Sequence, residues 1–227
     1  NFYTISQRHP NLKTMFIQNG TRGYYADIFE LLDTVSTETH DAMTVDYIMT
    51  FGSNVGAAYS RYIQGKVIPM GSIKNNHVPN MDIRETNGIT FVSQWRKNGF
   101  FMHGKFYSHE SFFRKPDQLI IQSLIKYSHK NNKLLKIILV NHKNSSDRAA
   151  EETYFRELVG GDVSFSDLTG GYPTYRAVDA AGVVVGVDST VLYESIARGT
   201  KTAIFSIRSK FLGISKGFSF GWPSEYA

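Results

Sequence analysis

The sequence predicts an α/β protein built from two Rossmann-like domains with parallel sheets, the N-terminal one incomplete. Two observations support this fold class. Short apolar segments alternate with amphipathic helical segments through the second half of the 227 residues, and the apolar segments are continuous runs of Val, Ile and Leu. Strands of this kind are typical of a parallel sheet that is covered by helices on both faces.

The second half, residues 89–227, predicts a complete domain of this kind. We expect its strands at 89–95, 134–141, 162–167, 182–188 and 200–207. The first helix should open at Pro116 and carry on one side Leu119, Ile120, Leu124 and Tyr127. The second should start at Ser146 or Asp147 and end at Gly160. Shorter helices are expected over 172–181 and 190–198, with Gly199 closing the last.

The first half, residues 1–76, resembles the end of another such domain. Strands are expected over 12–20, 45–52 and 66–72, and helices over 24–33 and 54–64. A doubly wound sheet usually has about five strands, so three strands predict an incomplete domain. The polar segment 77–88 contains both Pro and Gly and is predicted to be a linker.

Composition and charge exclude several classes of protein. With 41% hydrophobic and 14% aromatic residues the chain is not disordered, and no run of 18 apolar residues predicts a membrane-spanning helix. There is no cysteine, and the seven histidines lack metal-binding spacing, so no metal is expected. Residues 1–88 carry seven Lys or Arg against eight Asp or Glu, whereas residues 89–227 carry 18 against 12. The basic second half favours an anionic ligand, anionic lipid headgroups or nucleic acid.

The sharpest local pattern is Gly-Val-Asp-Ser-Thr at 186–190, where a strand ends and a helix begins. The unpaired N–H groups of a helix start suit a phosphate, and the hydroxyls of Ser189 and Thr190 add donors. Glu194 lies one turn further on the face of Thr190, within reach of a ribose. A purely structural interpretation is equally concrete: Ser189 is an ordinary N-cap, and Glu194 pairs with Arg198 on an exposed surface.

This pattern resembles the nucleotide motif of GT-B glycosyltransferases, especially the bacterial surface-polysaccharide group that includes the retaining β-Kdo transferases. Further segments match in the expected order: Ile17-Gln18-Asn19-Gly20 with Arg22, Asp27-Ile28-Phe29, 45–48, 69–76, 91–95 and 220–223. The resemblance implies a GT-B-like fold, in which two Rossmann-like domains with parallel sheets face a cleft. The acceptor-side domain would be 1–76 and the nucleotide-sugar domain 89–227.

The same resemblance implies a function in lipopolysaccharide or capsule synthesis. The sugar donor would be CMP-activated, specifically CMP-Kdo, and the acceptor a growing or lipid-linked glycan. The family needs no cofactor beyond this CMP-sugar. It implies a cytoplasmic enzyme, with peripheral association at the inner membrane as a further expectation.

Carboxylates are the catalytic candidates, because retaining transfer by double displacement needs a carboxylate nucleophile and inversion needs a general base. Asp27, just past a predicted strand end, is the first candidate and Glu110 the second; for Asp27 the structural alternative is a helix-start acid. Asp188 would repel a phosphate and is expected instead to bond the backbone amides of its turn.

Polar residues at other strand ends are the binding candidates. Ser93 and Gln94 are expected to contact the phosphate or base of the sugar donor, and Arg96 and Lys105 to neutralise the leaving phosphate. The expected sugar- or acceptor-binding residues come from the first half: Gln18, Asn19, Arg22, Gly71, Ser72, Asn75 and Asn76. Turn formation is the alternative role for the two neighbouring asparagines.

Two other kinds of function stay open. A sugar-nucleotide 2-epimerase of the same architecture would also bind phosphate at the last strand–helix turn. A non-catalytic nucleic-acid-binding module would fit the basic charge, and a non-catalytic glycan-binding module would fit the incomplete N-terminal half. However, the basic residues are dispersed and no strand combines them with aromatic residues as RNA-binding strands do, so nucleic acid is not favoured as a partner.

Overall fold

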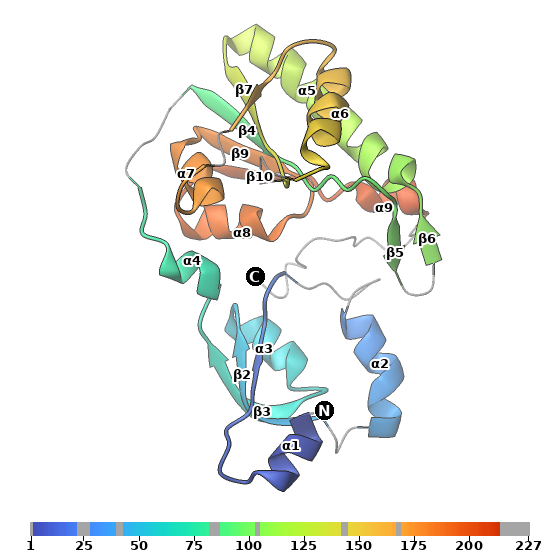
Figure 1. Ribbon diagram of the computed structural model, residues 1–227, viewed down its shortest axis with the longest axis vertical. Coiled ribbons are helices and arrows are strands. Elements are labelled where there is room, and N and C mark those ends of the chain that lie inside the picture. Colours follow the sequence, from blue (N-terminus) through green and yellow to red (C-terminus); the bar gives the residue numbers. More distant parts are fainter. Residues whose placement is uncertain are drawn as a thin grey trace. The chain divides into compact units, whose positions relative to one another are not determined.

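The computed structural model of the protein describes residues 2–21, 28–39, 43–81, 87–102, 105–141, 145–166 and 169–213 (Figure 1). The described residues up to His77 form one compact unit, called unit 1 here, and those from Val78 onward form a second, unit 2. Each unit contains a parallel sheet. The predicted α/β class with parallel strands is therefore confirmed.

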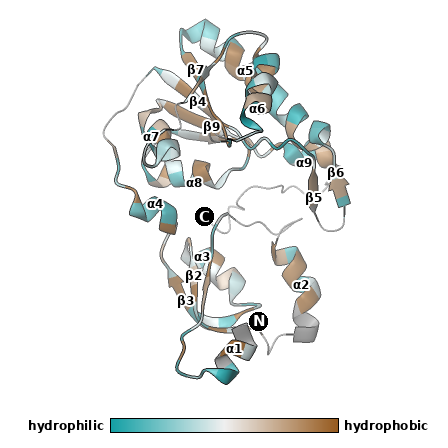
Figure 2. Cartoon of the chain, in the orientation of Figure 1, coloured by the Kyte–Doolittle hydropathy of each residue, from teal (hydrophilic) through white to brown (hydrophobic). Residues whose placement is uncertain are grey.

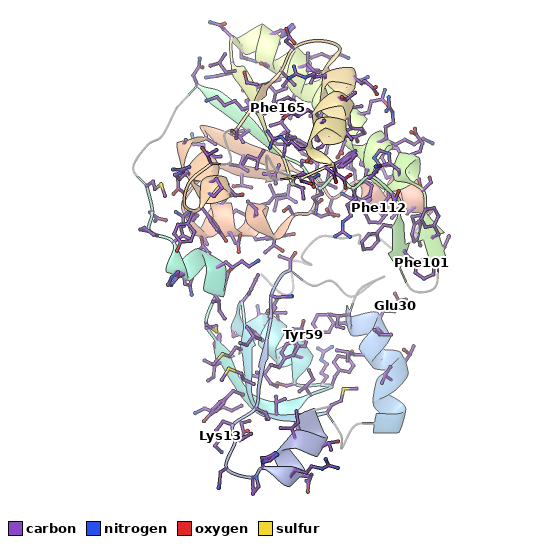
Figure 3. The ribbon with its side chains drawn as sticks, viewed as in Figure 1. Lys13, Glu30, Tyr59, Phe101, Phe112 and Phe165 are labelled. Atoms are coloured by element: carbon purple, nitrogen blue, oxygen red, sulfur yellow. The ribbon has the colours of Figure 1, made fainter. Side chains whose placement is uncertain are left out.

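Unit 1 has a three-stranded parallel sheet in the order β1-β2-β3. Its elements are α1 (Phe2–Arg8), β1 (Met15–Ile17), α2 (Ile28–Thr39), β2 (Thr44–Thr50), α3 (Ser53–Tyr59), β3 (Gln64–Pro69) and α4 (Ile73–His77). All three expected strands are present. The core contains Phe29, Ile48 and Tyr59, of which Figure 3 labels Tyr59. The ring centroids of Phe29 and Tyr59 lie 4.9 Å apart.

The helix expected over 54–64 is shorter than predicted, because α3 ends at Tyr59 and the chain turns into β3 within four residues. Gly56 lies where α3 packs on β3: a Cβ at this position would be 2.5 Å from Cγ1 of Val67. Glycine therefore allows the close approach of helix and strand in unit 1.

Unit 2 has a five-stranded parallel sheet in the order β10-β9-β4-β7-β8. Its strands are β4 (Gly88–Val92), β7 (Leu134–Ile138), β8 (Ser164–Phe165), β9 (Val183–Gly186) and β10 (Thr202–Ile204). The chain begins in the middle with β4, proceeds outward through β7 and β8, and then continues on the other side with β9 and β10. This Rossmann order reverses direction between β4 and β9.

The helices of unit 2 cover this sheet. They are α5 (Lys115–Asn131), α6 (Arg148–Val159), α7 (Pro173–Ala180), α8 (Thr190–Ala197) and α9 (Arg208–Leu212). Helices α5 and α6 pack together on one side and α7 and α8 on the other (Figure 1). Figure 2 shows hydrophobic residues along β7 and β9, whereas the helices carry both hydrophobic and hydrophilic residues. The predicted stop of α6 is confirmed, since Gly160 adopts φ 76°, a left-handed conformation that glycine favours.

Helix α5 buries the predicted face in part: Ile120 is buried and Leu124 packs against the core. Leu119 and Tyr127, expected on the apolar side, are 49% and 54% exposed. The buried residues are Pro116, Asp117, Ile120, Ile121 and Ser128. Two of the buried positions, Asp117 and Ser128, are polar, so a pattern of apolar residues does not indicate them. The Asp117 carboxylate, for example, accepts a hydrogen bond from the Tyr154 hydroxyl at 2.9 Å.

Unit 2 also contains two elements that we did not predict from the sequence. Strands β5 (Phe100–Met102) and β6 (Lys105–Tyr107) form an antiparallel hairpin. A π-helical turn, η2 (Glu110–Arg114), continues directly into α5. The helix therefore starts before Pro116, the residue expected to open it. Among the described helices, none is both long and apolar enough to cross a membrane.

Arg198, just after α8, forms hydrogen bonds both to helix α7 and to the first residues of unit 2. Its guanidinium donates to the Asp179 carboxylate through Nε, at 2.6 Å, and through Nη2. It also donates to the carbonyls of Val78 and Pro79, at 3.0 and 2.8 Å. The first part of the segment expected to be a linker is thus bound to α7 and α8. The structural interpretation placed Glu194 and Arg198 as a pair on an exposed surface. This is wrong, because Arg198 is 5% exposed.

Candidate functional site

The candidate site is the edge of the unit 2 sheet where β4 and β9 end. These neighbouring parallel strands flank the point at which the strand order reverses. Ligands of doubly wound sheets bind at such a point, outside the carboxyl ends of the strands. Ser93 and Gln94 follow β4, and Asp188 and Ser189 lie between β9 and α8. The structure therefore brings four of the residues singled out from the sequence to one sheet edge.

Ser189 is the N-cap residue of α8, as the structural interpretation expected, but its side chain does not cap the helix. Its backbone is extended, with φ −69° and ψ 140°, and its hydroxyl makes no capping hydrogen bond. An N-cap serine ordinarily accepts a hydrogen bond from one of the first helical N–H groups. At this helix start, the N–H of Leu192 instead donates to the backbone carbonyl of Ser189, at 3.0 Å.

Glu194 lies one turn into α8 and is 6% exposed. Its Oε2 accepts a hydrogen bond from the Tyr175 hydroxyl at 3.0 Å. Burial raises the pKa of Tyr175, and the neighbouring carboxylate raises it further. Tyr175 therefore stays a protonated donor at neutral pH and fixes the orientation of the Glu194 carboxylate. Sequence reasoning missed Tyr175, whose position three residues into a short helix carries no distinctive signal.

Gln94 and Asp188 are joined by Arg208, the first residue of α9. The Nη2 of Arg208 donates to Gln94 Oε1 at 3.0 Å and to Asp188 Oδ1 at 3.2 Å. Arg208 is 1% exposed, and its guanidinium lies 4.3 Å from the ring centroid of Phe112, which Figure 3 labels. Burial raises the pKa of Asp188, whereas Arg208 and Gln94 act in the opposite direction. Asp188 was expected to bond backbone amides. Its carboxylate instead accepts from Arg208, which also bonds Gln94, so these side chains connect the segments that follow β9 and β4.

Ser93 is also bonded within the protein. It is 3% exposed; its hydroxyl donates to Glu151 Oε1 at 2.6 Å and accepts from the N–H of Trp95 at 3.1 Å. Fully buried Glu151, in α6, accepts further hydrogen bonds from the N–H groups of Val140 and Asn141 and from the Asn141 amide, each at 2.9 Å. Glu151 thus ties the segment after β4 to the segment after β7.

Asp117, in the first turn of α5, is a further buried carboxylate. It is 2% exposed, and burial raises its pKa to about 7, outweighing the opposing influences of Arg208 and the Tyr154 hydroxyl. The charges of Asp188 and Glu151 raise this pKa further. Folding therefore favours the protonated form of Asp117.

We expect Asp117→Asn to change how the stability depends on pH. The folded-state pKa of about 7 exceeds the ordinary 3.8, so the folded wild type binds more protons and loses stability as the pH rises from about 4 to 7. The variant lacks this loss and should gain stability relative to wild type between pH 5 and 8. Urea unfolding at both pH values measures the gain. The matched control is Asp162→Asn at an exposed site; equal pH profiles for Asp117→Asn and wild type would contradict the expectation.

In unit 1, the candidates after β1 form a turn. Gln18 is 3% exposed; its Nε2 donates to the Gly20 carbonyl and its Oε1 accepts from the N–H of Phe51, both at 2.9 Å. This side chain joins the turn after β1 to the residues after β2. Asn19 is exposed in the same turn, whereas Arg22 and Asp27 lie outside the described residues.

The candidates after β3 surround the start of α4. Gly71 adopts a left-handed φ of 77°, and the Asn76 amide donates to the Met70 carbonyl at 2.6 Å. The Ser72 hydroxyl accepts from the N–H of Asn75 at 3.4 Å. The turn-forming alternative therefore has direct support at Asn76, while sugar or acceptor binding stays a prediction for these residues.

The remaining candidates surround the hairpin and η2. The Glu110 side chain is 55% exposed and lies 3.8 Å from the Arg114 guanidinium. Arg96 lies over the Phe100 ring and Lys105 over the Tyr107 ring, each 5.1 Å from the centroid. In the part of the chain that is described, no cluster of His, Cys, Asp or Glu is arranged to hold a metal ion.

Comparison with known proteins identifies a family and shows a distant likeness to solved structures. Residues 15–227 match the model of a family described as "putative O-antigen biosynthesis protein". No curated protein matches the chain. A solved structure, the "Glycosylation Associate Protein (Gap123) complex" of Streptococcus agalactiae, is similar with a TM-score of 0.45 and 16% identity. The match covers 78% of this chain and 35% of that one, so this chain spans about a third of its length.

Proposed function

Because the chain belongs to this family of O-antigen biosynthesis proteins, we propose that it is a glycosyltransferase that takes its sugar from a nucleotide. The proposed sugar donor is CMP-Kdo and the proposed acceptor a surface-polysaccharide or lipid-linked glycan, both on the resemblance to β-Kdo transferases. Unit 2 is the proposed nucleotide-sugar domain and unit 1 the acceptor-side domain of a GT-B-like enzyme.

The observation that carries the proposal is the start of α8 beside the point where the strand order reverses. The Ser189 hydroxyl makes no capping hydrogen bond at this helix start, and the start of a helix is a favourable position for a phosphate. Glu194, fixed by Tyr175 one turn further, is the proposed partner of the ribose diol. Asp188 would repel a phosphate, but Arg208 is bonded to its carboxylate and offsets that charge.

Two carboxylates are proposed for the chemical step. Asp27 is proposed from its position after the first strand of unit 1 and lies outside the described residues. Glu110 is accessible on η2, where its ion pair with Arg114 is long, at 3.8 Å, and partly exposed, and is therefore weak. The Glu110 carboxylate can therefore contact a substrate without first breaking a buried hydrogen bond or ion pair.

We expect Glu194→Gln to weaken CMP binding by more than tenfold. The variant keeps the size of the side chain and can still accept from Tyr175, but it loses the charge that strengthens a hydrogen bond to a ribose hydroxyl, worth about 1.5–3 kcal/mol. Isothermal titration calorimetry with CMP measures the change. The matched control is Glu152→Gln in α6, whose carboxylate pairs with Arg148 and should not affect binding.

Two results would contradict this proposal. Unchanged CMP affinity in Glu194→Gln would show that Glu194 does not bind the ribose. The second is a thermal-shift comparison of CMP, CDP, UDP and GDP in which UDP stabilises the protein most. That result would exclude a CMP-sugar as the donor and favour the 2-epimerase alternative.

A further inference from the structure

A buried carboxylate lies directly before the helix start at which the nucleotide phosphate is proposed to bind. Asp188 precedes Ser189, the N-cap residue of α8, and its side chain is 5% exposed. Water screens a buried charge poorly, so this carboxylate repels an anion more strongly than an exposed one would. A phosphate can bind well at the start of α8 only if another group offsets the charge of Asp188.

Arg208 supplies the opposite charge, and two kinds of contact fix its position. Its Nη2 donates both to Gln94 Oε1 and to Asp188 Oδ1. Its guanidinium also lies 4.3 Å from the ring centroid of Phe112 and 5.3 Å from that of Phe113. A planar guanidinium can stack on aromatic rings while it binds polar groups, which a lysine ammonium does less well. Arginine is therefore the cation that suits this position.

Both rings come from η2, the π-helical turn that we did not predict from the sequence. Phe112 and Phe113 are consecutive and buried, and both lie against the same guanidinium. Single π-helical turns within α-helices are frequently found at functional sites. By orienting Arg208, η2 acts on the end of β9 although its two phenylalanines are buried inside unit 2.

Further buried carboxyl groups increase the need for the charge of Arg208. Asp117 in α5 and Glu151 in α6 are buried near Asp188, since the charges of Asp188 and Glu151 both raise the pKa of Asp117. Arg208 and the hydrogen bond from the Tyr154 hydroxyl lower that pKa. Without Arg208, this group of carboxyls would either carry an unbalanced negative charge or bind additional protons.

Arg208 is itself 1% exposed and already bonded to two side chains, so it acts on a ligand through Asp188 and not by contact. We propose that Arg208, oriented by Phe112 and Phe113, is the positioning residue that allows the start of α8 to bind a phosphate, because it neutralises and holds Asp188. This assignment rests on the proposed nucleotide site. It extends that site to η2 and α9, whose residues the resemblance to glycosyltransferases did not single out.

The test is isothermal titration calorimetry with CMP, at about pH 8.5 to favour ionised carboxylates. Arg208→Met should weaken CMP binding about tenfold, because the charge of Asp188 is left unbalanced. Asp188→Asn should bind CMP at least as tightly as wild type, because it removes the repelling charge and keeps Arg208. The double variant Arg208→Met/Asp188→Asn should return to within about threefold of wild type. A purely structural role of the pair predicts instead that each of these substitutions weakens binding.

Two further variants complete the design. Arg208→Lys keeps the charge and should lose less CMP affinity than Arg208→Met. The matched control is Arg156→Met, which breaks an exposed ion pair with Asp162 and should bind CMP like wild type. Urea unfolding of every variant separates lost binding from lost folding, and Asp188→Asn tests the same pair with a side chain of nearly equal size.

The outcomes distinguish this assignment from the nucleotide site on which it rests. If wild type bound none of CMP, CDP, UDP and GDP, the nucleotide site would be wrong and the role of Arg208 with it. Three results would overturn the role of Arg208 alone in a wild type that binds CMP: unchanged affinity in Arg208→Met, weaker binding in Asp188→Asn, or no recovery in the double variant.

Discussion

Replacing Arg198 by Met is expected to destabilise unit 2 by about 3–5 kcal/mol, as is typical when one partner of a buried ion pair is removed. The substitution leaves the carboxylate of Asp179, which is 4% exposed, without its guanidinium. It also removes the donors to the carbonyls of Val78 and Pro79. Both consequences arise in the folded state, where water cannot readily replace the lost donors.

Urea unfolding at neutral pH measures this effect. The control Arg156→Met breaks an exposed pair with Asp162 and should change the free energy of unfolding by less than about 1 kcal/mol. The double variant Arg198→Met/Asp179→Leu should recover part of the loss, because it removes the buried charge as well as its partner. Equal stability of Arg198→Met and Arg156→Met would show that the buried network contributes nothing.

Glu151→Ala is expected to cost about 3–5 kcal/mol, since hydrogen bonds to a buried charged acceptor are strong and their unpaired donors are costly. Four donors lose their acceptor at once: the Ser93 hydroxyl, the N–H groups of Val140 and Asn141, and the Asn141 amide. The segments after β4 and β7 then lose the side chain that joins them.

The neighbouring position supplies the control for this second variant. Glu152→Ala removes a part-exposed carboxylate that pairs with Arg148 and should cost about 1 kcal/mol or less. Ser93→Ala, which removes one of the four bonds, should fall between the two in urea unfolding. If Glu151→Ala were no less stable than Glu152→Ala, the four bonds would not stabilise the fold.

The sheet of unit 2 could be predicted because its strands are continuous apolar segments separated by helices. The run Val183–Gly186, for example, cannot form one face of an amphipathic helix, and its length suits a strand. The end of helix α6 was equally predictable, because Gly160 readily adopts the left-handed conformation found there. Such signals are local, so a single sequence contains them in full.

The partners of buried charges could not be predicted, because they are distant in the chain. Arg208 bonds Gln94 across 114 positions and Arg198 bonds Pro79 across 119. On a helical pattern, a charged residue is ordinarily interpreted as exposed. The polar residues after β4 were assigned to the correct sheet edge, but their bonds to Glu151 and Arg208 depend on helices whose packing the sequence does not specify.

The two outermost strands of the unit 2 sheet have a consequence for self-association. Strands β8 and β10 are two and three residues long. A long outer strand offers a row of unsatisfied backbone groups to which another chain can add, as in domain swapping and fibril growth. These outer strands offer only a few such groups, too few to align an incoming segment. The sheet is therefore a poor template for aggregation through its borders, although all its strands run in parallel and its interior is strongly apolar.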